Sequence, residues 1–147
     1  MNKLAAVLAG AWLGLQLGIG YLAVPVLFSH MTKMEAGAMA GSMFNVVAYS
    51  GLAVWLLIYF IGRHELSRSL IRTKTNKFVL LLLALLAINQ FLVTPVIEAH
   101  KAGTTNWLLS LVGGSFGQWH GTSSVIYMVC SILAFGLVFR MLRLEWH

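Results

Sequence analysis

An uncharged apolar run at residues 4–28 limits this chain more than any other feature of its sequence. A run of about 25 residues can cross a lipid bilayer as a helix with some tilt. Three further runs follow, and we expect helices at about residues 4–29, 41–61, 78–97 and 121–142. With 59% hydrophobic and 10% charged residues, the sequence predicts an all-α integral membrane protein. Residues 1–147 would form one domain, a bundle of four transmembrane helices.

The basic residues predict how the four helices are oriented. Eight of them fall on one side of the membrane: Lys3, Arg63, Arg68, Arg72, Lys74, Lys77, Arg140 and Arg143. Only Lys33 and Lys101 fall on the other side. Because cytoplasmic loops are enriched in Lys and Arg, we expect both termini in the cytoplasm and a multi-pass protein of the bacterial inner membrane. The net charge of +6 then reflects topology and lipid headgroups, and no nucleic-acid partner is expected. The lipid bilayer is the expected partner, and a homo-oligomer or a larger membrane complex is compatible with the pattern.

The first helix carries a face of small residues, Gly10, Gly14 and Gly18, spaced four apart. In lipid such spacing allows close helix contact, so this face is predicted to be a packing surface. Gln16 lies in the apolar middle of the same helix, where a buried amide needs a hydrogen-bond partner. Trp12 is expected in the aromatic belt at the membrane interface.

Polar residues recur at helical spacing in the outer halves of the last three helices. Polar groups at that depth are costly against lipid and should face the bundle interior or a wet cavity. We therefore expect an outward-facing polar site, in which Glu98 at the end of the third helix pairs with His120 at the start of the fourth. The candidate ligand-binding residues are Asn45, Gln90, Thr94, Glu98, His120, Ser124 and Tyr127.

Three functional classes are compatible with these residues. In the favoured class, the polar site binds or moves a small polar ligand or a transition-metal ion, which imidazole and carboxylate groups suit. The candidate metal ligands are His30, Glu98, His100 and His120. The first alternative is an accessory subunit that acts through helix packing within a membrane complex. The second, less favoured alternative is a redox protein that uses haem b or a quinone. No hydrolytic or nucleotide-binding motif is present, which argues against an enzyme.

Two short segments add to this description. Residues 25–30, Pro-Val-Leu-Phe-Ser-His, are similar to residues 95–100, Pro-Val-Ile-Glu-Ala-His, at an offset of 70 residues. The match is either a chance similarity or a structural repeat about an axis along the membrane normal. Residues 107–112 are apolar but too short to span, so we expect a helical turn or two at the membrane interface.

Several sparse motifs together resemble the transmembrane protein 205-like family of small four-helix membrane proteins. The motifs are Gly10-Ala11-Trp12, Val24-Pro25-Val26-Leu27-Phe28, Ala36-Gly37, Asn89 with Pro95, and His120-Gly121 with Ser123-Ser124. The resemblance implies the four-helix fold and singles out His120, but it implies no particular activity. Animal relatives carry a longer segment before the last helix, where this chain has only residues 98–119.

Overall fold

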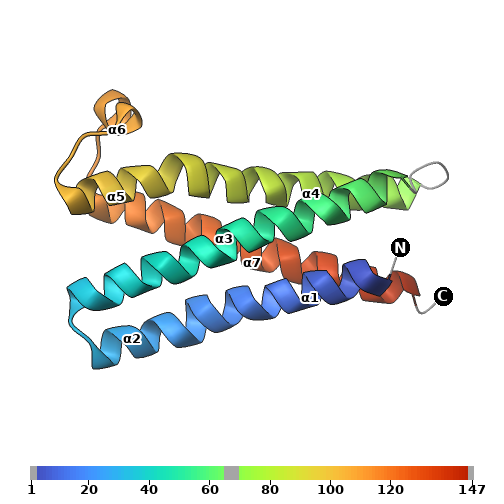
Figure 1. Ribbon diagram of the computed structural model, residues 1–147. Helices are drawn as coiled ribbons and strands as arrows, with labels where there is room; N and C mark the ends of the chain where they lie inside the picture. Colours follow the sequence, from blue (N-terminus) through green and yellow to red (C-terminus); the bar gives the residue numbers. More distant parts are fainter. Residues whose placement is uncertain (1–2, 65–69, 146–147) are drawn as a thin grey trace.

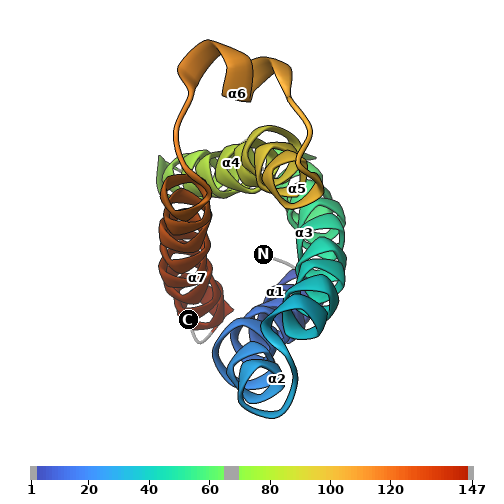
Figure 2. The same cartoon turned by 90° about the vertical axis from the view of Figure 1, so that its left-hand side faces the viewer.

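The computed structural model describes residues 3–64 and 70–145, and it confirms the predicted all-α membrane fold. Four helical stretches are long and apolar enough to cross a membrane: Lys3–His30, Lys33–Arg63, Lys74–Ala102 and Phe116–Arg143. They pack side by side as a bundle (Figure 1), and an end-on view shows them arranged in a ring (Figure 2). The protein is therefore a multi-pass membrane protein whose outer surface faces the lipid bilayer.

Two of the four crossings are interrupted helices and two are continuous. The first crossing consists of α1 (Lys3–Gly18), the π-helical segment η1 (Ile19–Ala23) and α2 (Val24–His30). The third crossing has the same build, with α4 (Leu70–Ile88), η3 (Asn89–Val93) and α5 (Thr94–Ala102). The continuous crossings are α3 (Lys33–His64) and α7 (Phe116–Glu145). The short helix α6 (Trp107–Val112) connects α5 to α7 at the residues where a short helix is predicted.

Helices α3 and α7 begin earlier than the predicted residues 41 and 121, because each starts with a capping box. The backbone N–H of Thr32 donates a 3.3 Å hydrogen bond to the Glu35 carboxylate, and the backbone N–H of Glu35 donates to the Thr32 hydroxyl at 3.4 Å. Ser115 and Gln118 form the equivalent pair, with bonds of 2.8 and 3.3 Å. Reciprocal bonds of this kind satisfy N–H groups in the first turn of a helix. Both helices therefore begin several residues before their apolar runs.

The internal repeat is visible in the backbone. The π-helical segments η1 and η3 begin at Ile19 and Asn89, which are 70 residues apart. Each segment is followed by a proline, and Pro25 and Pro95 are also 70 residues apart. A π-helical segment widens one turn of the helix, and a proline following it withholds the N–H that an upstream carbonyl would accept. In η3 the hydroxyl of Thr94 donates a 2.9 Å bond to the carbonyl of Asn89. The same irregularity at equivalent positions supports a structural repeat over a chance match.

The densest packing lies in the half of the bundle where α1 begins and α7 ends (Figure 1). The rings of Trp12 and Trp55 meet edge to face, with centroids 5.8 Å apart. Trp12 also donates a 2.9 Å hydrogen bond from Nε1 to the carbonyl of Val47, and it is only 3% exposed. The predicted interface position of Trp12 is therefore wrong, because this indole satisfies its N–H inside the protein.

The opposite half of the bundle, where α2 and α5 lie, is loosely packed by comparison, and we call it the outer half. Among the described residues, none of α2 and none of residues 116–129 in α7 is buried. The pair α2 and α3 separates from the pair α5 and α7 toward this end (Figure 1). The predicted polar residues therefore lie where the helices diverge, and several stay accessible.

Candidate functional site

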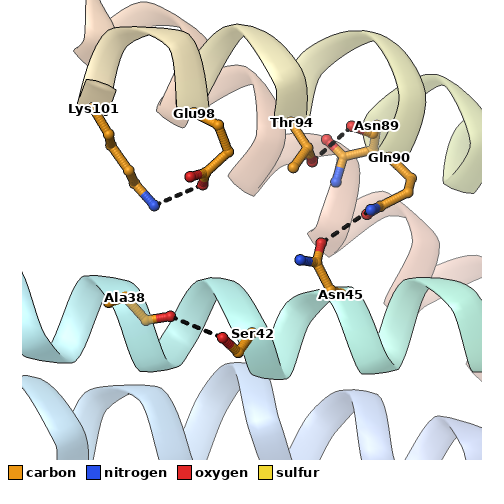
Figure 3. Close-up of polar contacts among 8 residues, drawn as sticks. All are labelled: Ala38, Ser42, Asn45, Asn89, Gln90, Thr94, Glu98 and Lys101. Carbon is orange, nitrogen blue, oxygen red and sulfur yellow. Dashed lines mark hydrogen bonds and ion pairs between the residues drawn. The ribbon is translucent and has the colours of Figure 1, made fainter. Parts of the chain in front are cut away.

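Polar side chains from α3, η3 and α5 face one another along one side of the outer half (Figure 3). We call this strip the polar seam, and it consists of Gly41, Asn45, Gln90, Thr94, Glu98 and Lys101. The sequence predicted four of these residues as ligand-binding residues: Asn45, Gln90, Thr94 and Glu98. Lys101 was missed, although its spacing of three residues from Glu98 on one helix was a visible signal.

The deeper end of the polar seam is an amide pair. Nε2 of Gln90 donates a 3.0 Å hydrogen bond to Oδ1 of Asn45, which joins η3 to α3. Gln90 is buried, whereas Asn45 is exposed. Beside them, Oδ1 of Asn89 is buried and has no hydrogen-bond partner among the described residues. An amide oxygen in that state can still accept a hydrogen bond, and leaving it without one costs free energy.

The outer end of the polar seam is an ion pair. Nζ of Lys101 lies 2.9 Å from Oε1 of Glu98, and these side chains are 37% and 57% exposed. Both reach toward Gly41 of α3, where a Cβ atom would lie 3.7 Å from Nζ of Lys101 and 3.9 Å from Oε1 of Glu98. The pair thus extends from α5 to the backbone of α3 while staying accessible. Because exposed ion pairs are held weakly, both charges are available to a ligand.

The expected pairing of Glu98 with His120 is not formed. The His120 ring instead stacks on Phe116, with centroids 5.7 Å apart and planes 8° from parallel. Ser124 donates its hydroxyl hydrogen bond to the His120 carbonyl at 2.9 Å, within its own helix. Glu98 has an opposite charge one turn away in Lys101, and this local partner takes the place of the remote imidazole.

Tyr127 also lies outside the polar seam, where it joins α7 to α1. Its hydroxyl donates a 2.5 Å hydrogen bond to the backbone carbonyl of Gln16, and its ring meets Phe44 edge to face. The side chain of Gln16 is fully buried and donates a 2.8 Å bond to Ser131. The NH2 group of Gln16 therefore finds hydrogen-bond partners on α7, whereas its buried Oε1 has none among the described residues. Tyr127 joins the first and last crossings and does not line the polar seam.

The structure does not assemble the predicted metal ligands. Nδ1 of His30 lies 2.7 Å from the Ser29 hydroxyl at the exposed end of α2. His100 meets Phe116 edge to face at 6.3 Å, so one phenyl ring contacts both His100 and His120. Within residues 3–64 and 70–145, no three His, Cys, Asp or Glu side chains form a group that could hold a metal ion. The same arrangement gives no support to a haem held between these two histidines.

The glycine face of α1 is not a packing face within this chain. A Cβ atom added to Gly10, Gly14 or Gly18 would meet no described atom within 4 Å. The buried face of α1 carries other residues: Ala5, Ala6, Ala9, Trp12, Leu13 and Gln16. The prediction was wrong because spacing identifies residues on one face but not the direction in which that face points. Close contacts lie instead at Gly20 of η1, whose Cβ would clash with the Tyr127 ring, and at Gly51 of α3, whose Cβ would come within 2.6 Å of the Trp12 ring.

Comparisons with known proteins identify a family for this chain, but they do not identify an activity. A family model described as a domain of unknown function, DUF4149, matches residues 7–106, which include most of the first crossing and all of the second and third. An uncharacterized protein of Aquifex aeolicus (strain VF5) is 31% identical over 139 residues, which is 93% of each chain. No solved structure matches this chain. These matches do not support the resemblance to the transmembrane protein 205-like family.

Proposed function

This chain belongs to the DUF4149 family, and we propose that it is a protein of the bacterial inner membrane that binds a small polar ligand at the polar seam. The related protein comes from a bacterium. Eight basic residues lie on the side of the chain ends and two on the other side, and this asymmetry supports cytoplasmic termini. The polar seam would then open to the outside of the cell.

One observation carries this proposal: the polar seam offers groups of different chemistry that remain accessible between two helices. An acid and a base stand at its outer end, in Glu98 and Lys101, and the exposed Asn45 lies deeper on α3. Gln90 and Lys101 are 11 residues apart, so the strip is about 16 Å long at the rise of an α-helix. Polar groups at membrane depth are costly and usually serve a substrate or ion pathway. A molecule with both a positive and a negative group suits this pair of charges.

Thermal unfolding of the purified protein in detergent tests the proposal. Each of the common L-amino acids, followed by small carboxylates and amines, is added to the protein and the Tm is measured. A compound that binds only the folded state raises the Tm. That increase should disappear in the Lys101→Gln variant. It should persist in Lys33→Gln, a matched control, because Lys33 is exposed on the same side but lies outside the polar seam.

Two outcomes would contradict binding at the polar seam. In the first, no compound of the series changes the Tm of the unsubstituted protein. In the second, a compound raises the Tm equally in the Lys101→Gln and Lys33→Gln variants.

The open glycine face favours a second candidate, an accessory subunit that packs against a partner helix. A Cβ atom added to Gly10, Gly14 or Gly18 would meet no neighbouring helix within 4 Å, so another backbone could approach α1 closely. In mildly solubilised membranes, Gly14→Leu should then release the chain from a larger assembly. If the native size of the solubilised protein is unchanged by Gly14→Leu, the accessory role through this face is excluded.

A further inference from the structure

The short helix α6 lies outside the ring of spanning helices. The end-on view shows it displaced outward from α4, α5 and α7, away from the centre of the bundle (Figure 2). Along the length of the bundle it lies level with α5 and does not extend past the end of that helix (Figure 1). α6 is therefore placed beside the outer part of the membrane-spanning region.

Five of the six side chains of α6 are apolar, all except Ser110, and none of the six is buried against the rest of the described chain. Trp107 is 66% exposed, Leu111 76% and Val112 64%. Together they form an apolar surface on a helix of six residues. A helix this short is not stable in water by itself, so its surroundings must contribute to its stability.

The connections to α6 are well defined. Asn106 caps the helix by accepting a 2.8 Å hydrogen bond from the Leu108 N–H. Nε1 of Trp119 donates a 3.0 Å bond to the carbonyl of Gly113, which fastens the exit of α6 to α7. Gly113 and Gly114 have φ angles of 72° and 102°, a backbone region that favours glycine. The cap at Asn106, the Trp119 hydrogen bond and the two glycines therefore hold α6 in its outward position.

The charge pattern of this segment differs from that of a loop surrounded by water. From residue 102 to residue 139 the chain contains no Asp, Glu, Lys or Arg. The stretch includes α6, both of its connections and the outer half of α7. A segment without charges can enter the interfacial region of a bilayer without the cost of burying ions.

We propose that α6 inserts its apolar side chains into the outer leaflet and docks the loop between α5 and α7 onto the membrane. The occupant of its apolar surface is lipid, because this surface continues the lipid-facing surface of the spanning helices at the same level. Helices of this kind lie in the interface with their apolar side among the acyl chains, and Trp is enriched at that depth. The inference is independent of what binds at the polar seam.

Spin labelling in lipid vesicles tests the proposal. A nitroxide is attached to Leu111→Cys in a Cys130→Ala background, and the protein is placed in vesicles of phosphatidylethanolamine and phosphatidylglycerol. Collision of the label with oxygen, which partitions into lipid, is compared with collision with a water-soluble nickel chelate. We expect the label to favour oxygen, as a label at Ile132→Cys should, because Ile132 is 64% exposed on a spanning helix. A label at Lys33→Cys supplies the aqueous reference, since Lys33 is exposed beside the outer turn between α2 and α3.

Two results would overturn the proposal. If the Leu111→Cys label collides with the nickel chelate as often as the Lys33→Cys label does, then α6 lies in water. If the label is shielded from both reagents and shows spin–spin broadening, a second copy of the chain covers α6. Val112→Cys should repeat the lipid-like result, which separates the position of the helix from a local disturbance at one residue.

Discussion

The side-chain nitrogen of Gln16 donates a 2.8 Å hydrogen bond to the hydroxyl of Ser131, 115 residues away in the chain. Ser131 in turn donates to the carbonyl of Tyr127 at 2.9 Å. The three residues form a polar contact between α1 and α7 within a largely apolar bundle. Because lipid offers no hydrogen-bond partners, this contact fixes how the first and last crossings face each other.

The Gln16 contact leads to the first prediction. Gln16→Leu should lower the free energy of unfolding by on the order of 1 kcal/mol, the scale of a hydrogen bond between membrane helices. Ser131→Ala should have a similar effect, and the double variant should lose less than the sum of the two. Ser42→Ala is the control, because the Ser42 hydroxyl binds only a carbonyl of its own helix. Thermal unfolding in detergent measures all four, and additive losses would show that the Gln16–Ser131 bond is not stabilising.

The contact between Trp12 and Gly51 leads to a second prediction. A methyl group at Gly51 would come within 2.6 Å of the Trp12 ring, which is held by its bond to Val47. Gly51→Ala should therefore destabilise the protein by about 1–3 kcal/mol, the usual cost of overpacking a core. Gly14→Ala, also in a membrane helix, should leave the stability of the isolated chain unchanged, because its Cβ would meet nothing. Equal Tm values for the two variants would contradict this packing.

The number of crossings was predictable because each apolar run is long enough to span a bilayer, and this signal is local. The starts of α3 and α7 were also readable, since Thr32 with Glu35 and Ser115 with Gln118 have the spacing of a capping box. The predicted starts at residues 41 and 121 followed the apolar runs, which begin after these polar first turns. For the π-helical segments the only signal in the sequence was the prolines at residues 25 and 95. A proline indicates that a helix is irregular but does not indicate that the irregularity is a π-helical turn.

The candidate site was only partly predictable, because helical spacing does not give the rotation of one helix against another. Asn45 and Gln90 each lay on a recognised polar face, and the structure joins them. Glu98 has a basic residue three positions away, and that local pair prevailed over a pairing with His120. Only the rotation of α7, which depends on tertiary packing, could have shown that the His120 ring stacks on Phe116.

The amide pair of the polar seam gives a third prediction. In Asn45→Leu, the buried Nε2 of Gln90 loses its acceptor, so the variant should be less stable by about 1–3 kcal/mol, the cost of an unsatisfied buried group. Adding Gln90→Leu removes the stranded amide and should recover part of the stability. Chemical or thermal unfolding of the two single variants and the double variant measures this coupling. A double variant that is less stable than both single variants would show that the pair does not interact as the structure describes.

The repeated π-helical segments give the last prediction, which concerns motion. In η1 and η3 a widened turn precedes Pro25 or Pro95, and each proline leaves an upstream carbonyl without its usual donor. Backbone of this kind has lower local stability than a regular helix. In hydrogen exchange monitored by mass spectrometry, peptides covering residues 19–24 and 89–94 should exchange faster than residues 8–18 and 78–88. Residues 44–55 of the continuous helix α3 serve as the control at similar depth. If the π-helical segments are as well protected as this part of α3, they are rigid and do not divide the two crossings into separately moving halves.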